Sequence, residues 1–217
     1  MKYRLAVFDL DGTILNTLDD LAGSINYALK CSDMPERTID EVRSFVGNGI
    51  RKLVERAVPK GTDSAIIDEV HNSFTVHYTD HCADKTKPYD GIEQLLANLR
   101  RAGCLTAVVS NKADYAVQGL CKQYFDGMFD YAVGEREGIR KKPAPDSVNE
   151  VLHRLGVPKN EAVYIGDSDV DVETAKNAGM DCISVEWGFR NRDFLEKHGA
   201  KLIVGSADEA EKIILSE

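Results

Sequence analysis

The sequence predicts an α/β protein, with a doubly wound and mostly parallel sheet and an all-helical domain inserted into it. Short apolar runs alternate with amphipathic stretches along most of the 217 residues, which is the order of strands and helices in a parallel sheet. Residues 16–87 break this alternation and show only helical periodicity. We therefore expect a core formed by residues 1–15 and 88–217, which is long enough to be stable without disulfides.

Five short apolar runs outside the insertion are expected to form the strands. Polar residues and glycines end several of them: Ser110 and Asn111 are expected to stop the second, and Gly166 and Asp167 the third. In chain order the expected strands cover residues 4–8, 105–109, 162–165, 182–185 and 202–204.

Apolar residues recur three or four positions apart between these runs, which predicts amphipathic helices. Gly156 and Gly179 are expected to end two of them. The expected core helices cover residues 92–101, 113–124, 148–155, 172–178 and 207–214. The same spacing fills the insertion, and Pro88 and Gly91 mark its exit.

The composition excludes several classes of partner. The chain carries 27 Lys and Arg against 36 Asp and Glu, a formal net charge of −9. A chain this acidic repels a phosphate backbone, so we expect no nucleic-acid partner. No apolar run approaches the ~20 residues that span a bilayer, so we expect no membrane partner. The five cysteines form no CxxC pair, which favours a cytoplasmic protein.

Two carboxylates follow the first expected strand, in the segment Asp9-Leu10-Asp11-Gly12-Thr13. Side chains two apart at a strand end can face the same side, so Asp9 and Asp11 can act together. Such a pair offers one group as nucleophile or metal ligand and the other as proton carrier. Gly12 allows a sharp turn, and the amides around Gly12 and Thr13 are candidates for binding a phosphate.

A second acidic cluster, containing Asp167, Asp169 and Asp171, follows the third expected strand. The carboxyl ends of parallel strands share one edge of a sheet, where open α/β folds bind their ligands. Clustered carboxylates repel one another unless a cation lies between them, and oxygen ligands of this kind suit Mg²⁺. The two acidic clusters therefore predict a Mg²⁺ site. Spacing alone does not choose between Asp169 and Asp171 as the supporting acid.

Two further segments offer groups that bind phosphate. Ser110 and Asn111 follow the second expected strand and carry a hydroxyl and an amide. Lys142 stands before Pro143, at a rigid turn that starts a helix. A solvated basic loop is the alternative interpretation of that lysine. The chain order of Asp pair, Ser, Lys and acidic cluster, each beside a strand, favours one shared site.

In this order the motifs resemble those of the haloacid dehalogenase superfamily of phosphotransferases, across the whole core. The resemblance implies a Rossmann-like core of residues 1–15 and 88–217, and a cap domain of residues 16–87 that closes over the site. It implies that Asp9 is the nucleophile, forming an aspartyl-phosphate, and that Asp11 is the general acid and then the base. An acid at the position of Asp11 indicates phosphoester chemistry rather than dehalogenation.

The same resemblance implies roles for the other motif residues. Ser110 would bind the transferring phosphoryl group, with Asn111 beside it, and Lys142 would neutralise the phosphate and the nucleophile. Asp171 would bind the metal through water or support Lys142. The implied Mg²⁺ ligands are Asp9, Asp167 and the carbonyl of Asp11.

Within the insertion, Gly47-Asn48-Gly49 precedes a helix and offers backbone amides to a carboxylate or a second phosphate. An ordinary interhelical turn has the same pattern. Beside the core motifs, this loop (Gly47, Asn48 and Gly49) resembles the substrate-specificity loop of the phosphoglycolate phosphatase-like branch. The expected activity is therefore hydrolysis of a small phosphorylated metabolite, with 2-phosphoglycolate as the best candidate.

Three alternatives keep part of this chemistry. A pyrophosphatase or nucleotide phosphatase of the same superfamily would use the same core motifs, and a phosphosugar mutase would move phosphate between hydroxyls. A phosphorylatable receiver-like signalling module would share the sheet and the acidic site, but it needs neither Asp11 as a proton carrier nor a helical lid. The chain is expected to act as a monomer or a homodimer.

Overall fold

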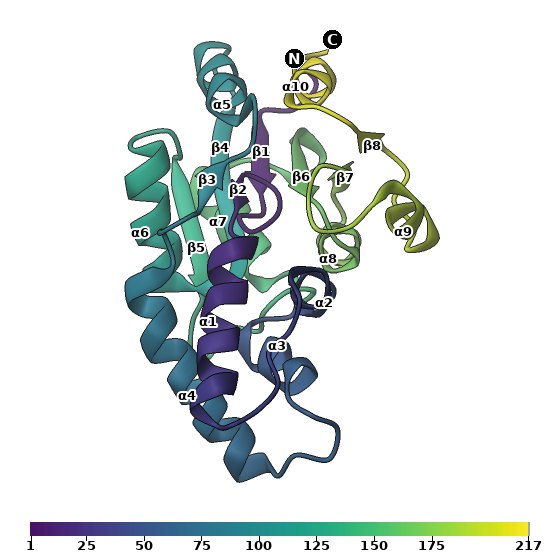
Figure 1. Ribbon diagram of the computed structural model, residues 1–217. Helices are drawn as coiled ribbons and strands as arrows, with labels where there is room; N and C mark the ends of the chain where they lie inside the picture. Colours follow the sequence, from purple (N-terminus) through teal and green to yellow (C-terminus); the bar gives the residue numbers. More distant parts are fainter. Residues whose placement is uncertain (217) are drawn as a thin grey trace. The chain divides into compact units, whose positions relative to one another are not determined.

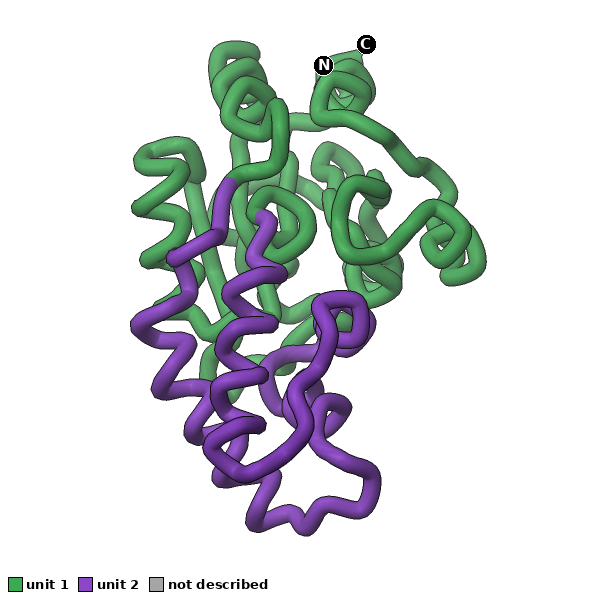
Figure 2. The backbone as a smooth tube through the Cα atoms, in the orientation of Figure 1, with its two compact units in different colours: residues 1–15, 88–217 green, residues 16–87 purple. Residues whose placement is uncertain are grey.

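The computed structural model describes residues 1–216, which form two compact units (Figure 2). One unit combines Met1–Leu15 with the chain from Pro88 onward, and the other is Asn16–Lys87. The chain passes between the units at two short strands, β2 (Leu15–Asn16) and β3 (Lys87–Pro88), which pair with each other. Each unit is described below by itself.

The first unit contains a six-stranded sheet in the order β5-β4-β1-β6-β7-β8, and its described pairs are all parallel (Figure 1). Helices alternate with the strands along the chain, which confirms the predicted α/β class. The strands are β1 (Leu5–Phe8), β4 (Leu105–Ala113), β5 (Tyr131–Glu135), β6 (Ala162–Gly166), β7 (Asp181–Val185) and β8 (Ile203–Val204). The helices are α5 (Ile92–Arg101), α6 (Asp114–Phe125), α7 (Asp146–Leu155), α8 (Asp169–Ala178), α9 (Arg192–Lys197) and α10 (Ala207–Leu215), with a 3₁₀ turn at Lys159–Glu161.

Strand β1 lies in the interior of this sheet and is buried on both faces. On one face its side chains join a core with α7 and α8, formed by Leu5, Val7, Tyr164, Val148, Val151 and Ala175. On the other face the ring of Phe8 meets that of Phe129 edge to face, with centroids 6.3 Å apart. Because both faces are covered, β1 appears in the sequence as an unbroken apolar run.

Strand β4 continues through Ser110 and Asn111 to Ala113, beyond the end that the sequence predicts. Its pairing with β5 shifts register between Val109 and Ala113, as at a β-bulge. The polar residues stay within the strand because their side chains are buried among partners. Strand β5 and helix α9 are not predicted, since β5 is only partly buried and α9 is six residues long.

The second unit is helical between its two linking strands. It contains α1 (Leu18–Cys31), α2 (Ile39–Phe45), α3 (Ile50–Ala57) and α4 (Ser64–His81). Helices α1 and α4 bury apolar side chains that include Leu21, Ile25, Val70 and Phe74. Among residues 1–216, no helix combines the length and apolar character needed to cross a membrane.

A buried carboxylate connects the two ends of this unit. Asp20, in the first turn of α1, accepts hydrogen bonds from the amides of Lys85 and Thr86 at 2.8–3.0 Å, and from the Thr86 hydroxyl at 2.8 Å. These hydrogen bonds replace those to water that the Asp20 carboxylate and its donors lose on burial, and bonds to a charged acceptor are strong. Asp20 therefore holds the chain that enters α1 beside the chain that leaves the unit.

We expect Asp20→Ala to lower the free energy of unfolding by about 2–3 kcal/mol, because the amides of Lys85 and Thr86 lose a charged acceptor. Urea denaturation measures the change. The exposed Asp19 in the same helical turn is the matched control, and Asp19→Ala should cost less than about 1 kcal/mol. Equal effects of the two substitutions would contradict the role given to Asp20.

Candidate active site

Three adjacent strands bring the predicted motifs to one edge of the sheet. Phe8 at the end of β1 is in register with Val108 of β4 and Ile165 of β6. The next residue, Asp9, donates its amide to the Ile165 carbonyl at 2.9 Å, so β1 is still paired where its carboxylate begins. Ser110 lies two residues beyond Val108 within β4, and Asp167 directly follows β6.

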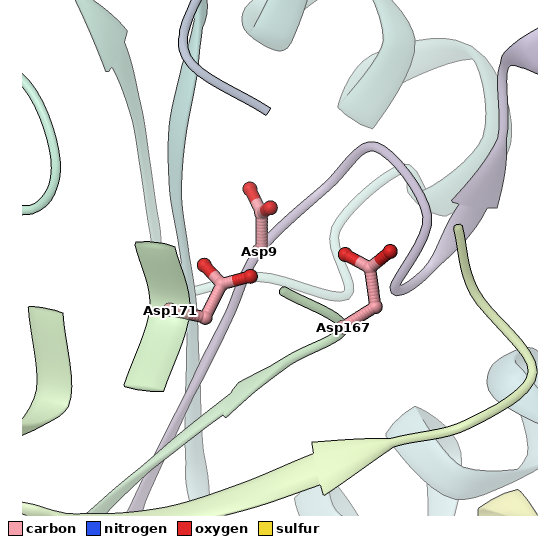
Figure 3. A group of neighbouring side chains, drawn as sticks. All are labelled: Asp9, Asp167 and Asp171. Atoms are coloured by element: carbon pink, nitrogen blue, oxygen red, sulfur yellow. The ribbon is translucent and has the colours of Figure 1, made fainter. Parts of the chain in front are cut away.

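Three buried carboxylates gather at this edge (Figure 3). Asp9, Asp167 and Asp171 each offer an oxygen, and these oxygens lie within 4.8 Å of one another. They come from the end of β1, the end of β6 and the first turn of α8. Strand order predicted that the acids after β1 and β6 share one sheet edge and left the choice between Asp169 and Asp171 open, and the structure brings Asp9, Asp167 and Asp171 together.

Burial and mutual repulsion make this cluster electrostatically demanding. Burial raises the pKa of Asp9 to about 7, against the lowering effect of Lys142, and the carboxylates of Asp171 and Asp11 add to the rise. Burial also raises the pKa of Asp167 well above its ordinary value, and repulsion from the carboxylates of Asp171 and Asp9 raises it further. In this cluster three buried carboxylates lie around one contacting ammonium, that of Lys142.

Lys142 is the cation at the centre of the cluster. Its Nζ lies 2.9 Å from Asp9 Oδ1, 2.8 Å from Asp171 Oδ1 and 3.0 Å from the Tyr164 hydroxyl, and its side chain is 3% exposed. Burial alone would lower the pKa of Lys142, but Asp171 and Asp9 outweigh it, so that pKa is well above its usual value. The lysine is a buried ammonium and not part of a solvated basic loop.

Asp171, rather than Asp169, supports this cation. Asp171 is fully buried and accepts hydrogen bonds from the Ser168 amide at 3.1 Å and the Ser168 hydroxyl at 2.6 Å, besides that from Lys142. The Ser168 contacts form the capping box that begins α8. Spacing could not decide between the two acids, because the choice depends on which one the cap turns inward.

Asp11 is paired with a second buried lysine, Lys112, which lies outside the predicted motifs. Lys112, in the last part of β4, places its Nζ 2.9 Å from Asp11 Oδ1, and its side chain is 3% exposed. Its position two residues after Ser110 on a strand was the available signal, since such residues share a face. The extension of β4 past the expected stop hid that signal.

A tight turn carries Asp11 toward the acidic cluster. Gly12 has φ +83°, and a Cβ added there would lie 2.4 Å from Asp167 Oδ2. The amides of Gly12 and Thr13 donate to the Leu15 and Leu10 carbonyls. Both amides therefore donate hydrogen bonds within the turn. A glycine is needed at position 12 because its φ is positive and because Asp167 lies too close for a side chain.

The loop after β7 covers the same turn. The Trp187 indole donates to the Thr13 carbonyl at 3.0 Å, and the Phe189 amide donates to Asp167 Oδ2 at 2.7 Å. The Thr13 hydroxyl makes a longer contact of 3.4 Å with Asp167 Oδ1. One carboxylate oxygen of Asp167 is therefore fixed by a backbone donor.

The phosphate-binding candidates on β4 lie within this network. Ser110 and Asn111 are both buried, and the Asn111 side-chain amide donates to the Lys142 carbonyl at 3.1 Å. The Ser110 hydroxyl accepts from the Lys112 amide at 3.3 Å. Asn111 thereby connects β4 to the segment that carries the central cation.

The predicted substrate loop, Gly47 to Gly49, belongs to the helical unit. Gly47 and Gly49 have φ of +123° and +84°, and Gly49 precedes α3. Arg56 holds the loop by donating to Asn48 Oδ1 at 2.7 Å and to the Phe45 carbonyl at 2.6 Å. What the loop does for a substrate stays a prediction.

Comparison with known proteins identifies the class. The sequence profile of the haloacid dehalogenase-like hydrolases matches residues 6–185. The chain is 34% identical to a phosphoglycolate phosphatase of Mesorhizobium japonicum over 90% of this chain and 88% of that protein. It is 31% identical to a phosphoglycolate phosphatase of Pseudomonas putida over 99% of this chain and 84% of the other.

A solved structure from Lactobacillus delbrueckii subsp. bulgaricus, assigned as a phosphoglycolate phosphatase, superimposes with a TM-score of 0.96. It shares 42% identity and covers 100% of both chains. The chain belongs to the haloacid dehalogenase-like hydrolase family. Within that family it is an enzyme of the phosphoric monoester hydrolases.

The residues at the site fit a hard divalent cation, the cofactor that this family implies. The available donors are carboxylate and carbonyl oxygens, which Mg²⁺ prefers. Asp9, Asp167 and Asp171 offer three buried carboxylates, and Lys142 contacts only Asp9 and Asp171 among them. A divalent cation between them would supply the missing positive charge.

We expect Gly12→Ala to lower the free energy of unfolding by about 2–4 kcal/mol, because alanine is strained at positive φ and its methyl would overlap Asp167. Chemical denaturation tests this. Gly119, inside α6 with open space around a Cβ, is the control, and Gly119→Ala should be neutral or stabilising by up to about 1 kcal/mol. A tolerated Gly12→Ala would show that the turn relaxes away from Asp167.

Proposed function

We propose that this enzyme hydrolyses 2-phosphoglycolate with Mg²⁺, through a phosphate ester of Asp9. The observation that carries the chemistry is the buried contact of 2.9 Å between the Lys142 ammonium and the Asp9 carboxylate. The second acid, Asp11, lies nearby in an ion pair of its own with Lys112. The choice of substrate is supported by the relatives named phosphoglycolate phosphatase. The Lys142 ammonium orients the Asp9 carboxylate and opposes the rise in its pKa that burial causes.

In the first step Asp9 attacks the phosphorus atom of the substrate. A bond forms from a carboxylate oxygen of Asp9 to phosphorus, the bond from phosphorus to the substrate's alkyl oxygen breaks, and Asp11 gives its proton to that oxygen. Glycolate therefore leaves with its released oxygen as a neutral hydroxyl group. Lys142 and Ser110 bind the phosphoryl oxygens, whose charge is spread in a loose transition state.

In the second step a water molecule attacks the same phosphorus atom while Asp11 takes its proton. The bond from Asp9 to phosphorus breaks, inorganic phosphate leaves, and the Asp9 carboxylate and the Asp11 proton are both restored. Asp9, Asp167 and the Asp11 carbonyl would hold Mg²⁺, which supplies charge to offset the phosphoryl oxygens. Asp171 keeps Lys142 in place during both steps.

We expect Asp9→Asn to reduce phosphate release from 2-phosphoglycolate by more than about 10³-fold, because the amide is a poor nucleophile. A malachite green assay with Mg²⁺ measures the rate. In Asp11→Asn, acid-quenched protein incubated with ³²P-labelled p-nitrophenyl phosphate should retain more label than the wild type, because this leaving group needs no acid in the first step while the second step loses its base. Unchanged turnover in Asp9→Asn would exclude Asp9 as the nucleophile.

The substrate is tested by comparing 2-phosphoglycolate with pyrophosphate and nucleoside monophosphates. Preference for 2-phosphoglycolate in kcat/KM supports the proposal, and preference for another substrate replaces it while leaving the chemistry intact. A rearranged phosphosugar without released phosphate would indicate a mutase. Stable phosphorylated protein with no turnover would indicate a receiver-like module.

We expect Asp167→Ala to weaken Mg²⁺ binding by at least about 10-fold, because a buried ligand is removed. Isothermal titration of Mg²⁺ into the protein measures the affinity without any substrate. Asp169→Ala is the matched control from the same cluster, since Asp169 is more exposed than Asp167, and it should change the affinity by less than about 3-fold. Equal losses would show that Asp167 is no ligand.

A further inference from the structure

Lys112 and Asp11 form an ion pair that the proposed roles do not use. The two atoms Nζ and Oδ1 are 2.9 Å apart, and the side chains are 3% and 17% exposed. A buried ammonium is costly unless it is paired, so the contact restricts where both side chains can lie. Two buried lysines thus face the two members of the Asp pair: Lys142 contacts Asp9, and Lys112 contacts Asp11.

The backbone around Lys112 is held as firmly as its side chain. Its amide donates to the Ser110 hydroxyl, and the preceding Asn111 donates to the Lys142 carbonyl. The end of β4 therefore contacts two other parts of the site, Lys142 through Asn111 and Asp11 through Lys112. A lysine anchored in this way can fix the position of the carboxylate that it binds.

We propose that Lys112 is a positioning residue for proton transfer, which rests on the proposed function. By bonding Oδ1 of Asp11, it orients the carboxyl group so that Oδ2 carries the proton. In the first step that proton passes from Oδ2 to the leaving alkyl oxygen as its bond to phosphorus breaks. In the second step Oδ2 takes a proton from the attacking water, and Lys112 keeps its own protons throughout.

This role differs from direct binding of the phosphate in one measurable way. A proton carrier matters when the leaving oxygen is strongly basic, as in an alkyl phosphate, and matters little when p-nitrophenolate leaves. A residue that binds the phosphoryl group affects both substrates alike. Because kcat/KM reports the steps up to departure of the leaving group, it is the quantity to compare.

The experiment measures kcat/KM of Lys112→Met with 2-phosphoglycolate and with p-nitrophenyl phosphate. We expect a loss of about 10–100-fold for 2-phosphoglycolate, since small misplacement of a catalytic group costs this much, and less than about 5-fold for p-nitrophenyl phosphate. Lys112→Arg should restore part of the difference, because it keeps the charge. Lys176→Met, which changes an exposed lysine of α8, is the control and should match the wild type with both substrates.

A double substitution tests whether Lys112 acts through Asp11. In an Asp11→Asn background, adding Lys112→Met should change kcat/KM for 2-phosphoglycolate by less than about 3-fold. Equal losses with both substrates, or full additivity with Asp11→Asn, would overturn the inference. Should Lys112→Met not fold, Lys112→Gln carries the same comparisons. A wild type that turns over neither substrate would instead refute the proposed function.

Discussion

The pairing of Lys142 with two buried carboxylates is the interaction on which the rest of the catalytic unit depends. Asp9 and Asp171 lie 2.9 and 2.8 Å from its Nζ. Removing one partner of a buried pair leaves an uncompensated charge, at a cost of about 3–5 kcal/mol. The segments that carry Lys142, Asp9 and Asp171 must therefore be held in fixed positions. The local structure of these loops is thus a requirement for catalysis.

The parallel sheet meets this requirement by placing the ends of β1, β4 and β6 side by side. Asp9 is still hydrogen-bonded to β6 through its amide, so its carboxylate starts from a fixed strand end. Lys142 comes from a loop, where a lysine side chain has many conformations. The Asn111 side chain holds that loop to β4. Asp171, which the capping box of α8 orients, then fixes the position of the Lys142 ammonium. Packing of β1 on both faces keeps these connections rigid.

The sequence predicted what depends on local pattern and chain order. Apolar runs located β1, β4 and β6, and the rule that parallel strands end at one edge was enough to bring Asp9, Ser110 and Asp167 together. It could not predict what depends on side-chain direction. The inward turn of Asp171 follows from a cap, and the contact of Lys112 follows from a strand that continues beyond two polar residues. The contact of the Tyr164 hydroxyl with Lys142 could not be predicted for the same reason, because Tyr164 lies within an apolar strand and belongs to no polar motif.

Glycines explain how so many charged groups fit into one small volume. A Cβ at Gly12 or Gly188 would lie 2.4 Å from an atom of Asp167, and one at Gly166 would lie 2.3 Å from Asp171. Bare backbone therefore approaches these acids from several sides, where a side chain would push them apart. Close packing of backbone limits the rotamers that the acids can adopt, and their oxygens are oriented before any ligand arrives. The small residues of the motifs thus contribute to preorganisation as directly as the charged residues do.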